Sequence, residues 1–142
     1  MRNVKSVLIT GTTSGVGRAL LEFYAKSDAK IISVNRRRVP DLESRYPLVR
    51  FECVDVRSAE DVRKFVRTLA ESNEVPEVFI LNAGINRVDN DESFQLPVYR
   101  EVVDTNLYGV LNFVEPLIQL PVANSQRHVI AISSMVNYAG NP

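Results

Sequence analysis

The sequence is poor in cysteine and has no excess of charge of either sign. Its 142 residues include one cysteine, Cys53, so the chain can close no disulfide within itself and can build no cluster of thiolate metal ligands. We therefore expect no metal site, and either a reducing compartment or a protein indifferent to redox conditions. Cys53 is expected to fill space in the core. Lys and Arg together number 17, as do Asp and Glu. Because no overall field attracts nucleic acid or an acidic membrane surface, neither partner is expected.

Long hydrophobic runs are also missing. A membrane-spanning helix needs about 18 to 20 consecutive apolar residues, and no such run occurs. The apolar start of the chain is too short for a secretion signal and stops at Gly11. We therefore expect a cytoplasmic protein. With 45% hydrophobic and 24% charged residues, the composition fits one globular domain over residues 1–142.

Short apolar segments rich in valine and isoleucine alternate with segments of helical spacing. The expected strands are the stretch that ends at Thr10 and the ranges 29–34, 49–54, 77–81 and 127–133. Between them, apolar residues recur every three to four positions, which is typical of amphipathic helices. The alternation predicts an α/β fold, in which right-handed crossovers join parallel strands and helices cover both faces of the sheet.

Two positions indicate how the expected helices begin and bend. Ser58 precedes Ala59, Glu60 and Asp61, a pattern typical of a helix N-cap followed by acidic residues in the first turn. Pro116 lies within the last long apolar segment, where its missing N–H is expected to kink or loosen the helix. The sequence contains no internal repeat and no linker.

A glycine-rich turn joins the first expected strand to the first expected helix, which should begin at about Gly15. Gly11 can turn the chain sharply, Gly15 lets the backbone approach a pyrophosphate at the helix N-terminus, and Gly17 lets helix and sheet pack closely. A purely structural turn is the alternative. A nucleotide-triphosphate P-loop is excluded, because no Gly-Lys-Ser or Gly-Lys-Thr follows.

The chain resembles the short-chain dehydrogenases/reductases, whose TGxxxGxG turn matches residues 10–17 letter for letter. Further motifs follow in the family's order: Asp55 after the third strand, Leu-Asn-Ala-Gly at 81–84, Asn106 in the last long helix, and Ser134 after the fifth strand. The resemblance covers nearly the whole chain. It implies a Rossmann-like, doubly wound parallel sheet with strand order 3-2-1-4-5, and hydride transfer between a nicotinamide cofactor and a carbonyl or alcohol substrate.

The resemblance also implies which residues form the site. Asn106 and Ser134 would be catalytic, and the family's spacing favours Ser134 over Ser133. The cofactor-binding residues would be Gly11, Thr13, Ser14, Gly15, Val16, Gly17, Asn35, Arg36, Asp55, Val56, Asn82, Ala83 and Gly84. Structural roles are the alternative: Asn82 would tie loops together, Asp55 would cap a loop, and Asn106 would be an amide on a helix surface.

The end of the second expected strand bears on the choice of cofactor. An enzyme selective for NAD(H) usually places Asp or Glu there to bind the ribose hydroxyls, whereas this chain has Asn35 followed by Arg36, Arg37 and Arg38. A guanidinium can hold a 2′-phosphate through a bidentate, charge-assisted pair. We expect NADP(H) to be preferred, with Arg36 in contact, and a solvated arginine loop is the alternative. Ser14 stands where many phosphate-binding relatives carry a basic residue, so NAD(H) stays open as a second cofactor.

The family's catalytic tyrosine, and the lysine four residues after it, have no counterpart in this sequence. Counting from Ser134 would place the tyrosine near position ~147, past Pro142. Tyr138 is no substitute, because Pro142 stands four residues later in place of lysine. We expect the cofactor-binding part of an oxidoreductase, incomplete at its C-terminus and inactive alone. The alternatives are a naturally short pseudoenzyme that binds cofactor or a partner subunit, and a scaffold domain without nucleotide.

An incomplete sheet would leave apolar surface open. Without the family's later strands, the strand 127–133 becomes an exposed edge and part of the helix 106–118 loses its cover. We expect the isolated chain to associate through this surface. By the same resemblance, the complete form is expected to be a homo-oligomer.

Overall fold

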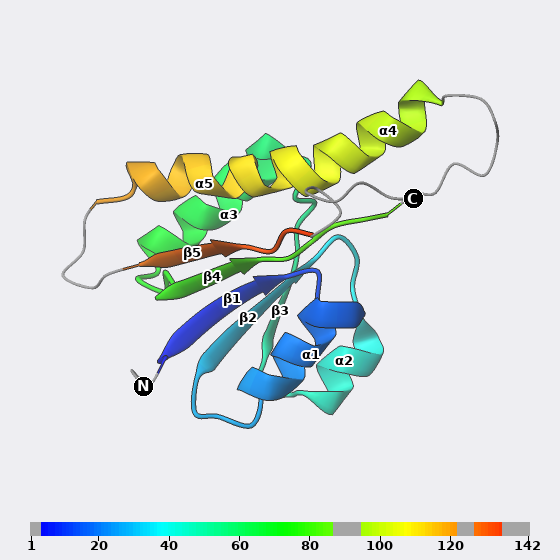
Figure 1. Ribbon diagram of the computed structural model, residues 1–142. Coiled ribbons are helices and arrows are strands. Elements are labelled where there is room, and N and C mark those ends of the chain that lie inside the picture. Colours follow the sequence, from blue (N-terminus) through cyan, green and yellow to red (C-terminus); the bar gives the residue numbers. More distant parts are fainter. Residues whose placement is uncertain (1–3, 87–94, 122–126, 135–142) are drawn as a thin grey trace.

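The computed structural model describes residues 4–86, 95–121 and 127–134, which form a parallel sheet with helices on both faces (Figure 1). The strands are β1 (Ser6–Thr10), β2 (Lys30–Asn35), β3 (Arg50–Cys53), β4 (Val78–Leu81) and β5 (His128–Ala131). Their order across the sheet is β3-β2-β1-β4-β5, and each neighbouring pair is parallel. The expected Rossmann-like fold with strand order 3-2-1-4-5 is confirmed.

Helices α1 (Gly15–Tyr24) and α2 (Pro40–Arg45) lie on one face of the sheet, and α3 (Ala59–Glu71) and α5 (Gly109–Gln119) lie on the other (Figure 1). A π-helical turn, η1 (Asp104–Tyr108), joins α4 (Leu96–Val103) to α5, so that the three form one long rod. In the described ranges, no helix has the length and apolar character needed to cross a bilayer. The sequence did not predict α2, because its six residues are too few to show a helical period.

The strand in the middle of the sheet shows why the strands are continuous apolar runs. Leu8 of β1 packs with Phe113 of α5 in one core, whereas Val7 and Ile9 pack with Leu21 of α1 in the other. Alternate side chains of a strand point to opposite faces. Because helices cover both faces, the three middle positions of β1, Val7, Leu8 and Ile9, are all apolar.

Helix α3 begins as the sequence predicts. The Ser58 Oγ accepts a hydrogen bond from the Asp61 backbone N–H at 3.2 Å, and Glu60 and Asp61 occupy the first turn. The apolar stripe is buried and consists of Val62, Phe65, Val66 and Leu69. One face of α3 therefore closes the core on its side of the sheet.

The kink or loosening expected at Pro116 does not interrupt the helix. The irregular turn is η1, at Asp104–Tyr108, and α5 continues past Pro116 to Gln119. Phe113 and Leu117, which flank the proline, are buried in the core. Their packing holds the helix across the hydrogen bond that proline cannot make.

The expected burial of Cys53 is also wrong. The thiol is exposed and lies 3.3 Å from the carbonyl oxygen of Arg36. Cys53 ends β3, which is the edge strand next to β2. An edge position lacks a covering neighbour, and sequence composition does not show which strand takes that position.

Strand β5 forms the opposite edge of the sheet and is exposed along its length. Val129 and Ile130 are 44% and 45% exposed, and on the neighbouring rod Leu107 and Ile118 are 53% and 76% exposed. The apolar surface expected at this edge is therefore present in the described residues. That the chain associates through it stays a prediction.

Candidate functional site

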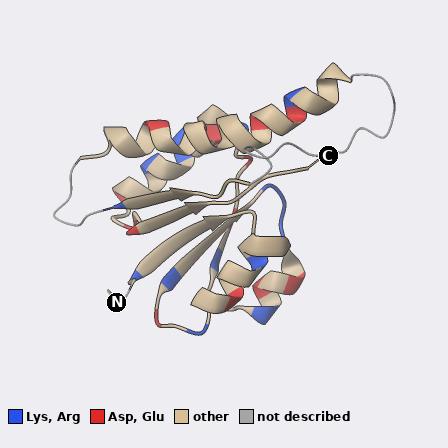
Figure 2. Cartoon of the chain, viewed as in Figure 1, with Lys and Arg blue, Asp and Glu red and all other residues tan. Residues whose placement is uncertain are grey.

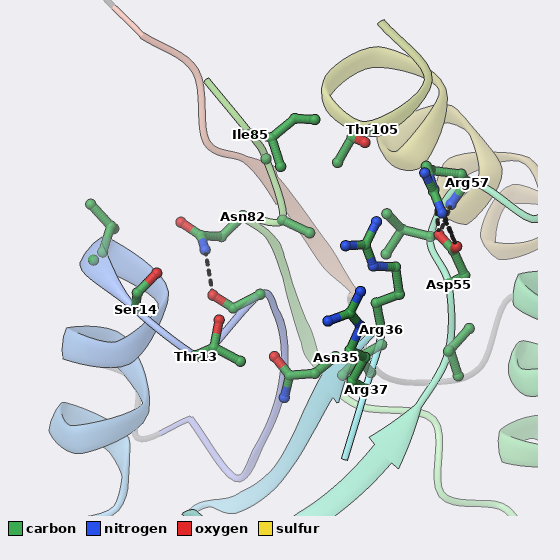
Figure 3. A pocket seen from close by; sticks show the side chains of 18 residues that line it. Thr13, Ser14, Asn35, Arg36, Arg37, Asp55, Arg57, Asn82, Ile85 and Thr105 are labelled. Atoms are coloured by element: carbon green, nitrogen blue, oxygen red, sulfur yellow. Dashed lines mark hydrogen bonds and ion pairs between the residues drawn. The ribbon is translucent and has the colours of Figure 1, made fainter. Parts of the chain in front are cut away.

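A cleft of about 430 Å³ opens at the carboxyl ends of β1, β2 and β4, beside the start of α1 (Figure 3). Every predicted cofactor residue lies on its wall except Gly17, which is buried behind it. The wall also includes residues that were not predicted: Val34, Arg37, Val54, Arg57, Ile85 and Thr105. Open α/β sheets bind their ligands at this edge, where parallel strands end.

Close backbone packing explains two of the glycines. Gly11 has a φ of +72°, and a Cβ there would lie 2.8 Å from the Cα of Ala83. A Cβ at Gly17 would overlap the Gly11 carbonyl oxygen and the Asn82 amide nitrogen. The turn is thus held tightly between α1 and the loop after β4, which leaves no room for a side chain.

The start of α1 is open toward the cleft. Gly15 has a φ of +55°, and a Cβ there would meet no atom within 4 Å. The Ser14 side chain makes no capping hydrogen bond to the first turn, so it does not use up the N–H groups at this end. A helix N-terminus facing open space suits an anion such as a pyrophosphate. The residues present therefore fit a dinucleotide here.

Hydrogen bonds fasten the loop after β4 to the glycine-rich turn. The Asn82 Nδ2 donates to the carbonyl oxygens of Thr10 and Gly11, each at 3.1 Å. In return, the Thr10 Oγ1 accepts from the backbone N–H groups of Asn82 and Ala83, each at 2.9 Å. Asn82 therefore ties two loops together, as its structural alternative predicts, and it also lines the cleft.

The Asn35 amide points inward at the end of β2. Its Oδ1 accepts from the Thr12 backbone N–H at 2.9 Å, and its Nδ2 donates to the hydroxyls of Thr12 and Ser33, each at 3.0 Å. All three residues are buried. Asn35 thus holds the shape of the glycine-rich turn in addition to lining the cleft.

Arg36 and Arg37 follow β2 and extend into the cleft beside Asn35 (Figure 3). Figure 2 shows charges of both signs spread over the helices, whereas the loop after β2 carries a run of basic residues. The Arg36 Nη1 lies 3.8 Å from the Glu101 Oε1 of α4, and the side chain is 44% exposed. A guanidinium in this position can reach an anion that enters the cleft.

Asp55 and Arg57 form a close ion pair beside Arg36, on the same side of the cleft (Figure 3). The Arg57 Nη2 lies 2.6 Å from the Asp55 Oδ2, and the Arg57 backbone N–H donates to Oδ1 at 3.0 Å. The Arg57 guanidinium lowers the pKa of Asp55 below its usual value and outweighs the effect of partial burial. Asp55 therefore stays ionised and holds Arg57 against the cleft.

Neither of the two predicted catalytic residues lines the cleft. In η1, the Asn106 side chain bonds both backbone groups of Ile85, which does line it. Ser134 is exposed three residues past the end of β5, at the same edge of the sheet. Tyr138 lies outside the described residues. In residues 4–86, 95–121 and 127–134, no group of three His, Cys, Asp or Glu could hold a metal ion.

Sequence reasoning missed Arg57 and Glu101. The spacing of Arg57, two residues after Asp55, is the signal that could have pointed to their ion pair. No local signal marks Glu101, because its partner Arg36 lies 65 residues earlier in the sequence. Only the fold brings the two side chains together.

Comparisons with known proteins identify the family of the chain. A family model described as short chain dehydrogenase matches residues 5–142. The chain is 29% identical over 145 residues to the uncharacterized oxidoreductase Lmo0432 of Listeria monocytogenes, covering 97% of this chain and 58% of that protein. It is 30% identical over 136 residues to the NADPH-dependent pterin aldehyde reductase of Arabidopsis thaliana, covering 92% and 56%. The chain thus spans a little over half the length of these curated relatives.

Solved structures resemble the chain along nearly its whole length. ElxO with NADP bound matches with a TM-score of 0.84 and 24% identity, covering 99% of this chain and 59% of that chain. A 3-ketoacyl-(acyl-carrier-protein) reductase from Brucella melitensis complexed with NADH matches with a TM-score of 0.83 and 22% identity, covering 97% and 60%. At these identities the likeness shows the fold, and the two neighbours hold different nicotinamide cofactors.

Proposed function

Because the chain belongs to the short chain dehydrogenase family, we propose that it forms the NADP(H)-binding part of an oxidoreductase. One observation carries the proposal: the open helix start at Gly15 and the guanidinium of Arg36 line the same cleft (Figure 3). The substrate class is a small-molecule carbonyl or alcohol. The whole protein would act in the cytoplasm as a homo-oligomer.

The residues of the cleft divide the work of binding. Backbone N–H groups at Gly15 and Val16 would receive the pyrophosphate, because they begin α1 and face open space. Asp55 and Val56 would border the adenine. Ala83 and Gly84 would border the nicotinamide half, on the loop that Asn82 fastens to the glycine-rich turn.

The preference for the phosphorylated cofactor rests on the end of β2. Asn35 is neutral and its amide is engaged with Thr12 and Ser33, so β2 ends without a carboxylate that would repel a 2′-phosphate. Arg36 and Arg37 bring two positive charges to the same wall. A charge-assisted pair with the phosphate would then favour NADP(H) over NAD(H).

Bound NADP(H) would supply or accept the hydride. Ser134 would donate a hydrogen bond to the substrate oxygen at the sheet edge, and Asn106 would position the loop around Ile85. The family's tyrosine and lysine are not among residues 1–142, so turnover is proposed for the whole protein.

The test is a titration of the full chain with NADPH and NADH, followed through the fluorescence of the reduced nicotinamide. We expect tighter binding of NADPH, and we expect Arg36→Ala to bring the two dissociation constants together. Arg63→Ala is the matched control, because Arg63 pairs with Glu115 of α5 and does not line the cleft. An unchanged ratio in Arg36→Ala would refute the preference, and no binding of either cofactor would favour a scaffold without nucleotide.

A second measurement separates the enzyme from a pseudoenzyme. Loss of reduced-cofactor absorbance is followed with a panel of ketones in the whole protein and in its Ser134→Ala variant. Turnover that the substitution abolishes supports the oxidoreductase. Cofactor binding with no turnover across the panel would favour a protein that binds cofactor or a partner subunit without catalysis.

A further inference from the structure

We propose that Glu101 of α4 sets how strongly the cleft discriminates between NADP(H) and NAD(H), because its carboxylate competes with the 2′-phosphate for Arg36. This inference rests on the proposed cofactor preference. The Glu101 Oε1 lies 3.8 Å from the Arg36 Nη1 and 3.7 Å from the Arg57 Nη1. Both arginines line the cleft, whereas Glu101 stands behind them and is not part of its wall.

The two arginines that share Glu101 are held very differently. Asp55 binds Arg57 through three guanidinium contacts of 2.6 to 3.1 Å. Among the ion pairs of the described residues, Arg36 has only the one with Glu101, and its 3.8 Å separation exceeds hydrogen-bond distance. A phosphate would therefore capture Arg36 and leave Arg57 with Asp55.

The charges around Arg36 fix the direction of the effect. A phosphate monoester carries about −1.5 to −2 charges at neutral pH, and a guanidinium shared with it would hold that charge close to Glu101. The two anions repel each other through a partly solvated space, since the Glu101 side chain is 31% exposed. The neutral 2′-hydroxyl of NAD(H) would feel no comparable repulsion. Glu101 thus weakens NADP(H) binding selectively.

The test uses Glu101→Gln, which keeps the shape of the side chain and removes its charge. In the full chain, we expect the dissociation constant for NADPH to fall about threefold to tenfold and that for NADH to change about twofold or less. Added salt should shrink the difference. Glu115→Gln is the matched control, because it removes the same charge from an ion pair with Arg63 away from the cleft.

Several results would overturn the role of Glu101. If Glu115→Gln changed the dissociation constant for NADPH as much as Glu101→Gln does, the effect would come from net charge and not from the position of Glu101. Weaker NADPH binding in Glu101→Gln would show that the carboxylate holds Arg36 in its binding position and does not compete. In the double variant with Arg36→Ala, the Glu101→Gln substitution should have no further effect on NADPH.

The parent proposal fails in a distinguishable way. If Arg36→Ala leaves the ratio of the two dissociation constants unchanged, the cofactor preference itself is wrong. If Arg36→Ala removes the preference and Glu101→Gln leaves it intact, only the role of Glu101 is wrong.

Discussion

The Asn106 side chain and the Ile85 backbone bond each other in both directions. The Asn106 Oδ1 accepts from the Ile85 N–H at 2.8 Å, and its Nδ2 donates to the Ile85 carbonyl oxygen at 2.9 Å. This reciprocal pair joins η1 to the loop after β4. It resembles one rung of a sheet, with an amide side chain taking the place of a strand, and it fixes a loop that borders the cleft.

Removing this pair should loosen the loop and the cleft together. Asn106→Ala leaves both Ile85 groups without their partner, so we expect a loss of about 1 to 2 kcal/mol in the free energy of unfolding. NADPH should also bind more weakly. Urea unfolding and cofactor titration measure the two effects. Gln119→Ala, at the exposed end of α5, is the control, and equal losses in both variants would contradict a special role for Asn106.

Two glycines of the same turn should respond differently to alanine. Gly17→Ala places a Cβ against the Gly11 carbonyl and the Asn82 amide, and such overpacking costs about 1 to 3 kcal/mol or more. Gly15→Ala meets open space, so its cost is the positive φ, about 1 to 2 kcal/mol. We therefore expect the larger loss of stability at Gly17 and the larger loss of NADPH affinity relative to stability at Gly15. A Gly17→Ala variant as stable as Gly15→Ala would contradict the close packing.

The ion pair of Asp55 and Arg57 should give stability an acid limit. Hydrogen bonding to Arg57 lowers the pKa of Asp55 below its usual 3.8. A depressed carboxyl pKa in the folded state stabilises the fold above the unfolded-state pKa, and this contribution is lost as pH falls through the folded-state value. Asp55→Asn should therefore be less stable than the unmodified chain near neutral pH, with the gap closing below about pH 4.

Urea unfolding at a series of pH values measures this gap. Asp28→Asn is the control, because Asp28 is exposed and makes no ion pair within the described residues. A gap between Asp55→Asn and the unmodified chain that stays constant, or widens, on acidification would contradict the predicted contribution.

The strands and the helices α1, α3 and α5 of the doubly wound fold could be predicted because their signals are local. The apolar run of β1 reflects cover on both faces, and the stripe of α3 from Val62 to Leu69 reflects cover on one. The glycine-rich turn could be predicted for the same reason. Gly11 and Gly15, which both adopt positive φ, lie within one short segment of the sequence.

The features that escaped prediction depend on neighbours distant in sequence. Cysteine is a residue type that is usually buried, and Cys53 is exposed only because it lies on the edge strand. Pro116 should disturb a helix in isolation, but the core around Phe113 holds it. The contact of Glu101 with Arg36 exists only because the fold brings α4 within reach of the loop after β2, and no residue near either side chain in the sequence reveals it.

The exposed side of α5 should drive association of the chain. Ile118 is 76% exposed there, and the edge strand β5 is exposed along its length. Exposed apolar side chains and an open strand edge favour pairing with another molecule. We expect sedimentation at micromolar concentration to show species larger than a monomer. Ile118→Glu should shift the distribution toward the monomer, because self-association would bury the new charge.

A matched substitution distinguishes association through this surface from non-specific hydrophobic association. Phe23 of α1 is 68% exposed and lies on the opposite face of the sheet (Figure 1). Phe23→Glu makes the same exchange of apolar area for charge, so it should leave the sedimentation profile unchanged. A chain that sediments as a clean monomer would contradict the prediction outright. If both variants shift the sedimentation profile toward the monomer equally, association depends on the total exposed apolar area and not on the surface formed by α5 and β5.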